Sequence, residues 1–262
     1  MALTLLAGPA SSGKVAALLE RYLHLLERDP VLIVPNRSDV DRIERDLLRR
    51  SPALMGGSIG TFDDVFERIA RGNGAHRPVI TPAQRTLLLR RIVSGAEGRS
   101  ARFSGFAESF GSTVAELESA LLEPSELEGE LAELYAAYRE ELDRLGLWDR
   151  ELERRHAAER AAGDLGAWDP RPVFAYGFED LTGAEWALLE ALAARADVTV
   201  SLPYEPGRDA FASLTRTADD LTRLADGRIE ELPPSREARS PVLAHLERSL
   251  FAAATAPPEL DG

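Results

Sequence analysis

The chain has 262 residues, of which 44% are hydrophobic and 29% charged, a composition typical of a globular protein with a substantial core. It contains no cysteine, which excludes disulfide frameworks, thiolate metal sites and cysteine nucleophiles. No apolar run approaches the roughly 20 residues that span a bilayer, so we expect a cytoplasmic protein without a membrane partner. The net charge of −13 argues against wholesale coating of nucleic acid but leaves a local binding site open.

Positive charge is carried almost entirely by arginine. Of the 31 basic residues only one, Lys14, is a lysine. Residues 1–100 carry 15 basic and 11 acidic side chains, whereas residues 101–262 carry 16 basic and 33 acidic ones. This asymmetry indicates either solvated, Glu-rich helices in the second part or an anion-binding surface confined to the first.

Strand and helix patterns alternate at the start of the chain. Three short apolar runs have the length of buried strands, and each is followed by a helical pattern. Ser38 or Asp39 is expected to cap the second helix. This alternation predicts an α/β fold with a parallel sheet covered by helices. The apolar runs are residues 3–6, 31–34 and 58–61, and the helical patterns cover residues 17–26, 40–48 and 62–70.

The middle of the chain is helical throughout. The pattern starts at Thr81-Pro82, which has the signature of a helix start, and continues to about Trp168. Ser125 and Glu128 are predicted to form a capping box. Apolar residues at helical spacing are predicted to form the core of three or four helices. They are Leu87, Leu88, Ile92, Phe103, Phe106, Phe110, Val114, Leu117, Leu121, Leu127, Leu131, Leu134, Tyr138, Leu142 and Leu145.

Strand patterns resume after the helical region, at residues 173–176 and 198–202, with a capping box predicted between them at Thr182 and Glu185. This order predicts that the helical region is an insertion into an α/β domain. The predicted parts are a first portion of the α/β domain at residues 1–80, an inserted all-α subdomain at 81–168, the remainder of the α/β domain at 169–232, and a tail at 233–262 with a short helix near 242–251.

One loop carries the most specific motif. Between the first apolar run and the first helical pattern, GPASSGK fits G-x-x-x-x-G-K in the strand-then-helix context that this motif requires. Small residues let the backbone N–H groups point at phosphate oxygens, and the helix N-terminus adds about half a positive charge. Lys14 supplies a compact charge to the phosphates. The residues predicted to bind a nucleotide, with ATP as the ligand, are Gly8, Pro9, Ala10, Ser11, Ser12, Gly13, Lys14 and Val15.

The last of these residues departs from the motif. The position after the lysine normally provides a hydroxyl group for Mg²⁺, and Val15 has none. Phosphate binding does not require that hydroxyl group, whereas hydrolysis requires the metal to be well held. The sequence therefore predicts ATP binding and leaves Mg²⁺ binding and hydrolysis open.

This loop and four further segments, in their order along the chain, resemble AddB-type proteins, the second subunits of bacterial ATP-dependent helicase–nucleases. The resemblance implies a UvrD-like superfamily 1 motor domain, that is, a RecA-like P-loop NTPase sheet with an inserted all-α subdomain. It also implies a role in DNA double-strand break repair, together with a partner subunit. The four segments are VLIVPNR at residues 31–37, GTFDD at 60–64, VFAYGF at 173–178 and SLPY at 201–204.

The resemblance also implies roles for single residues. In related motors the strand at residues 173–176 ends in an acidic residue that holds Mg²⁺, and here Tyr176 stands there. Glu179 and Asp180 follow as candidates for the catalytic acid, and no metal ligand is assigned. The family's second motor domain and PD-(D/E)XK nuclease domain are expected to lie outside this chain. The residues implied to lie near single-stranded DNA are Asn36, Arg37, Thr61 and Phe62.

Two functions remain open. The first is the ATP-binding motor domain of a DNA repair helicase–nuclease. The second is a P-loop scaffold that binds DNA or a partner subunit without hydrolysing ATP. A serine hydrolase at GGSIG, residues 56–60, fits poorly because no apolar strand precedes that segment.

Overall fold

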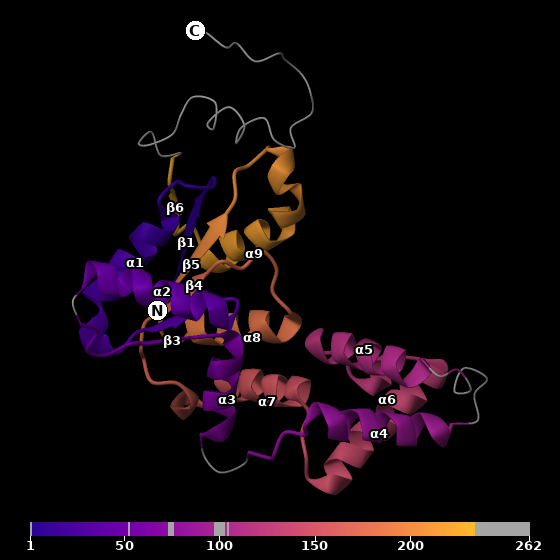
Figure 1. The fold of residues 1–262 in the computed structure, drawn as a ribbon. Helices are drawn as coiled ribbons and strands as arrows, with labels where there is room; N and C mark the ends of the chain where they lie inside the picture. Colours follow the sequence, from indigo (N-terminus) through magenta and orange to yellow (C-terminus); the bar gives the residue numbers. More distant parts are fainter. Residues whose placement is uncertain (1, 52, 73–75, 97–102, 104, 234–262) are drawn as a thin grey trace. The chain divides into compact units, whose positions relative to one another are not determined.

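The structure is a computed structural model and describes residues 2–51, 53–72, 76–96, 103 and 105–233. These residues form an α/β fold whose six strands build one parallel sheet, in the order β3-β2-β4-β5-β1-β6 (Figure 1). The chain divides into two compact units. A sheet unit comprises Met1–Thr61, Pro170–Asp180 and Leu192–Gly262, and a helical unit comprises Phe62–Asp169 and Leu181–Ala191.

The predicted parallel sheet is confirmed, and its inner strands at residues 31–33 and 173–176 are largely apolar and buried. Such strands suit a sheet that is buried on both faces, where side chains cannot alternate between core and solvent. The strand β6 was not predicted, because its three residues include a single apolar side chain. The strands are β1 (Ala2–Gly8), β2 (Val31–Ile33), β3 (Ser58–Gly60), β4 (Val173–Tyr176), β5 (Asp197–Pro203) and β6 (Ile229–Glu231).

Different helices cover the two faces of the sheet around β1. Successive side chains of a strand point to opposite faces. Leu6 packs with α1 (Lys14–His24) and α2 (Arg37–Arg50) in one apolar cluster. Leu5 lies instead on the side of α9 (Thr215–Ala225), a helix that was not predicted from the sequence. In Figure 1, α1 and α9 accordingly flank β1 from opposite sides.

The cap of α2 differs from the prediction. The capping residue is Asn36, whose side chain accepts a hydrogen bond from the backbone N–H of Asp39 at 3.0 Å. Ser38 and Asp39, the predicted caps, both lie inside the helix and bond to the Asn36 side chain. The prediction was wrong because Asn36 is itself a good capping residue and comes earlier in the chain, so the helix has already begun where Ser38 and Asp39 stand.

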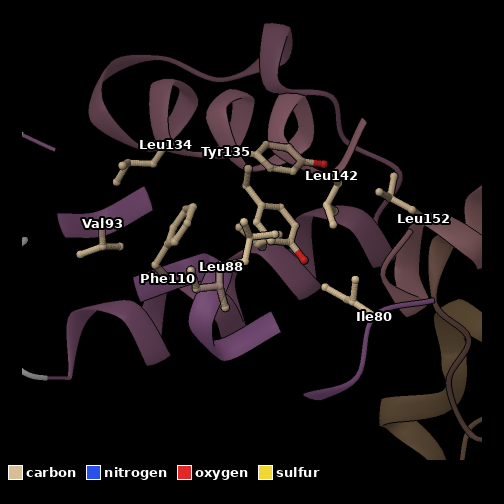
Figure 2. Packing of buried hydrophobic residues seen from close by; sticks show 11 residues of the cluster. Ile80, Leu88, Val93, Phe110, Leu134, Tyr135, Leu142 and Leu152 are labelled. Atoms are coloured by element: carbon tan, nitrogen blue, oxygen red, sulfur yellow. The ribbon is translucent and has the colours of Figure 1, made fainter. Parts of the chain in front are cut away.

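The helical unit surrounds an apolar core (Figure 2). Leu134, Tyr135 and Leu142 contribute to this core from α6, and Phe110 from α5. The unit contains four helices of the predicted helical region, together with α3 and residues 183–191 of α8. Its helices are α3 (Phe62–Arg71), α4 (Pro82–Ser94), α5 (Phe106–Ser119), α6 (Gly129–Leu145), α7 (Arg150–Gly163) and α8 (Gly183–Ala193). Short 3₁₀ segments occur at Leu26–Arg28, Pro124–Glu126, Leu165–Ala167 and Asp209–Leu214.

Three residues predicted to be core are exposed. Phe103 precedes α5 and is 74% exposed, while Leu87 is 67% and Leu145 is 45% exposed. In α4 the buried side chains are Leu88, Leu89 and Val93, so the apolar face is rotated from the one predicted through Leu87. A run of three leucines at residues 87–89 does not by itself define which side of the helix faces inward.

The helix start predicted at Thr81 and the capping box predicted at Thr182 are confirmed, and the box predicted at Ser125 is wrong. Thr81 caps α4 in a box with Gln84, and Thr182 forms a box with Glu185. Ser125 and Glu128 form no such box. The reciprocal bonds occur instead between Glu123 and Glu126 around the 3₁₀ segment, and the capping position of α6 has no side-chain bond.

The boundaries of the two units differ from the predicted domain boundaries. The helical unit begins at Phe62 rather than at residue 81, because α3 packs against α7. It also takes in Leu181–Ala191, which was predicted to belong to the remainder of the α/β domain. The predicted tail beyond Pro233, with its helix near residues 242–251, lies outside the described residues.

Candidate functional site

The loop at residues 8–14 follows the carboxyl end of β1, between the ends of β5 and β6. The backbone N–H of Tyr204, just after β5, donates to Gly8 O at 3.1 Å. The backbone N–H of Leu232, just after β6, donates to Ala7 O at 2.8 Å. Ligands of open parallel sheets bind outside the carboxyl ends of the strands, and this loop occupies such a position.

The backbone of the loop is shaped to present N–H groups. Ser11 and Gly13 adopt positive φ angles of 57° and 85°, which turn the chain tightly into α1. Gly13 is the capping residue of α1, and no side chain caps that end. The first turn of α1 also carries no acidic residue. The N–H groups and the positive end of the helix dipole are therefore not neutralised by side chains of the helix.

The Lys14 side chain is folded back onto the loop. Its ammonium group donates to Gly8 O at 2.8 Å, to Pro9 O, and to Ser12 Oγ at 3.1 Å. Lys14 is only 7% exposed. Burial lowers the pKa of this amine from its usual 10.5 to about 8. A buried ammonium group bonded to neutral oxygens lacks a counter-charge, and an anion in the loop would supply one.

The residues around this loop do not fit a bound Mg²⁺ ion. The Val15 side chain packs against the apolar cluster of α1 and α2 and has no oxygen to offer. In the part of the chain that the structure describes, no group of three histidine, cysteine or acidic residues is arranged to hold a metal ion.

The end of β4 carries a phenol instead of a carboxylate. Tyr176 Oη accepts a hydrogen bond from an Arg42 guanidinium N–H at 3.0 Å, and the guanidinium carbon lies 5.8 Å from the ring centroid. Arg42 is also paired with Asp39 at 2.7 Å. Glu179 and Asp180, which follow β4, are exposed, and the backbone oxygen of Glu179 accepts a bond from Thr217 Oγ1. Arg42 was not predicted as a site residue, because Tyr176 lies 134 residues further along the chain.

The residues implied to contact DNA have different surroundings. Asn36 and Arg37 are exposed at the start of α2, where the Asn36 side chain is engaged in capping. Thr61 follows β3 and is half-buried. The ends of β2 and β3 are adjacent, because Val34 N–H donates to Gly60 O at 2.8 Å. Phe62 belongs to the helical unit, is 4% exposed and lies 6.3 Å from the Phe66 ring.

Comparison with known proteins gives a consistent set of relatives, although no family model matches the chain. The chain is 28% identical to a protein of Desulforudis audaxviator over 96% of its own length and 25% of that protein. It is also 28% identical to a protein of Moorella thermoacetica, over 94% of the chain and 26% of the relative. A Desulforamulus reducens protein is 26% identical over 79% of the chain and 20% of the relative.

All three relatives are named as the same component of an ATP-dependent helicase/deoxyribonuclease. These similarities support an AddB-type subunit. The chain spans about a quarter of the length of these relatives. Among the described residues, no helix combines the length and the apolar character needed to cross a bilayer.

Proposed function

We propose that this chain is the nucleotide-binding part of a helicase–nuclease subunit of the AddB type, and that the loop at residues 8–14 binds the triphosphate of ATP. The observation that carries the proposal is the buried Lys14 ammonium group, held at the end of β1 beside uncapped N–H groups of α1. Hydrogen bonds from a cation to phosphate oxygens are stronger than those to carbonyl oxygens. A triphosphate therefore replaces Gly8 O and Pro9 O as the acceptor for Lys14.

We further propose that this site binds ATP without hydrolysing it. Two neighbouring features support binding without turnover. Val15 offers no metal ligand, and Tyr176 at the end of β4 is engaged by Arg42 where a water-orienting carboxylate is needed. The bound nucleotide then acts on the conformation of the loop and of α1. In this proposal the chain is closer to a scaffold than to a motor.

In the same proposal, the ends of β2 and β3 face single-stranded DNA. Arg37 supplies positive charge there for the phosphate backbone, and Asn36 and Thr61 supply polar groups. The relatives are named as subunits of an ATP-dependent helicase/deoxyribonuclease, which supports a partner subunit. A role in DNA repair is part of the same proposal. We also propose that the whole protein has a UvrD-like ancestry and carries a PD-(D/E)XK nuclease domain.

The binding proposal is tested by calorimetric titration of the full chain with ATP and with inorganic tripolyphosphate, each with and without Mg²⁺. We expect binding of both ligands without the metal. Lys14→Met should weaken both by about 10- to 100-fold, the range expected for lost charged hydrogen bonds. Arg45→Ala, which removes a positive charge from the exposed face of α2, should leave both affinities unchanged. Unaltered binding by Lys14→Met would contradict the proposal.

A second measurement distinguishes the scaffold from the motor. We expect the chain to release no inorganic phosphate from ATP above background, with Mg²⁺ and single-stranded DNA present. The Lys14→Met variant serves as the background control. Metal-dependent phosphate release that Lys14→Met abolishes would restore the motor hypothesis.

A further inference from the structure

A cavity of about 310 Å³ adjoins the loop, and Lys14 is not among the residues that line it. Gly8 and Pro9, the first two residues of the loop, form part of its wall. Leu5 and Thr222 also line it, so the cavity lies on the α9 face of the sheet, whereas Lys14 begins the helix on the opposite face. We call it the side cavity. A ligand that reaches both places crosses the end of β1.

The walls of the side cavity are tied to the loop by the backbone. Tyr204 lines the cavity, and its N–H donates to Gly8 O. Leu232 lines it too, and its N–H donates to Ala7 O. These two backbone hydrogen bonds hold Tyr204 and Leu232 in place against the end of β1 and the loop. The two places are therefore parts of one preformed surface within the sheet unit.

The size of the side cavity limits what it can hold. Binding sites for drug-sized ligands measure about 300–1,000 Å³. At about 310 Å³ the side cavity is at the lower end of this range. It suits a heterocyclic base with part of a sugar, and it is small for a complete nucleoside triphosphate.

The residues that line the cavity suit a base better than a phosphate group. Apolar side chains of β1 and β6 form much of the surface, and Tyr204 adds an aromatic ring. Two carboxylates, Glu205 and Glu231, also line the cavity. Glu205 is paired with Arg208 at 3.0 Å, whereas Glu231 is exposed. Carboxylates repel phosphate groups and accept hydrogen bonds from hydroxyl and amino groups.

We propose that the side cavity holds the nucleoside end of the same nucleotide whose phosphates Lys14 binds. This inference rests on the proposed function, because it needs a triphosphate in the loop. Glu205 and Glu231 line the cavity and the Lys14 ammonium group does not, so these charges fix the direction of the ligand. The sugar and base point toward α9, with Tyr204 against the base and Glu231 accepting from hydroxyl or amino groups.

The experiment compares two ligands that share the phosphate part, ATP and inorganic tripolyphosphate, in calorimetric titrations of the full chain. Replacing an aromatic residue that contacts a base weakens binding by about 5- to 100-fold. Tyr204→Ala should weaken the binding of ATP by such a factor. It should leave the binding of tripolyphosphate unchanged, because the backbone hydrogen bond from Tyr204 to Gly8 is kept. Arg45→Ala, on the exposed face of α2 in the same unit, does not alter the cavity lining and should change neither affinity.

A second variant tests the cavity by filling it with a larger side chain. Thr222 is exposed on α9 and lines the cavity. Thr222→Trp should prevent the binding of ATP and leave the binding of tripolyphosphate unchanged. If ATP and tripolyphosphate bind equally well and neither variant separates them, the inference is overturned and the proposed function survives. Equal weakening of both ligands by Tyr204→Ala would also overturn the inference. If tripolyphosphate does not bind the unmodified chain, the proposed function itself fails.

Discussion

The only lysine of the chain is held by three oxygen acceptors of its own loop, Gly8 O, Pro9 O and Ser12 Oγ. Burial lowers the pKa of Lys14 to about 8, so the folded loop holds its proton less tightly than an unfolded chain does. Between about pH 8 and 10.5 the unfolded state binds more protons, and the free energy of unfolding therefore rises with pH in that window. A bound phosphate favours the charged amine and moves its pKa back up.

The first prediction concerns this titration. The rate at which an amine-reactive reagent modifies Lys14 should increase with a midpoint near pH 8, and tripolyphosphate should shift the midpoint upward. The measurement is the labelling rate of the peptide containing Lys14, followed by mass spectrometry. The α-amino group is the other amine, and the Lys14→Arg variant gives its contribution. A midpoint that stays constant when tripolyphosphate is added at saturation would count against a phosphate contact.

A second prediction concerns a buried carboxylate in the helical unit. Glu118 on α5 is fully buried, and it pairs with Arg139 at 2.9 Å and with Arg155 at 3.5 Å. Removing one partner of a buried ion pair costs about 3–5 kcal/mol, because the remaining charge loses its compensation. We expect Glu118→Ala to lower the free energy of unfolding by about that amount. Urea unfolding measures this free energy of unfolding. The control Glu116→Ala, on the exposed side of the same helix, should change the free energy of unfolding by less than about 0.5 kcal/mol.

At the scale of single elements, the ends of helices provide a third prediction. Thr81 accepts from Gln84 N–H, and the Gln84 side chain accepts from Thr81 N–H. Thr81→Ala should lower the free energy of unfolding by about 1 kcal/mol. Ser125→Ala should have no measurable effect, because Ser125 is exposed and does not form the predicted box. Equal effects in urea unfolding would show that the capping bonds of Thr81 do not stabilise α4.

Elements were predicted well where several local signals agreed. The strand at residues 31–34 combines an apolar run with a following proline, and the loop at 8–14 combines a motif with its strand-then-helix context. Prediction failed where one signal stood alone. Phe103 matched the helical spacing, but Gly105 comes between it and α5 and the helix begins after it. β6 pairs with β1 although its residues carry little strand signal, since a neighbour distant in sequence stabilises it.

The sequence predicted only those parts of the candidate site whose residues are close together along the chain. Lys14, Val15 and the turn that carries them lie within one motif. Arg42 meets Tyr176 across 134 residues, and Tyr204 meets Gly8 only because β5 pairs with β1. Such pairs depend on the strand order, which a single sequence does not determine.

At the scale of the whole molecule, the division into two units gives a fourth prediction. A ligand that binds the folded loop stabilises the unit that contains it, by about 2.7 kcal/mol at a concentration of 100 times its Kd. Tripolyphosphate should therefore slow amide hydrogen exchange in β1, α1 and β5 of the sheet unit more than in α4 and α6 of the helical unit. Hydrogen-exchange mass spectrometry with Lys14→Met as the control measures this difference. Equal protection of all these elements would contradict a ligand confined to the loop.

The strand order has a consequence for synthesis on the ribosome. Within the described residues, β1 pairs with β5 and β6, so about 190 further residues are synthesised after β1 before its first pairing strand begins. At roughly 5–20 residues per second this delay lasts on the order of 10–40 s. During that time the apolar residues of β1 and the loop next to it are unpaired in the nascent chain. The loop at residues 8–14 therefore reaches its final surroundings long after its own synthesis, and chaperones that shield apolar segments can bind β1 during this time.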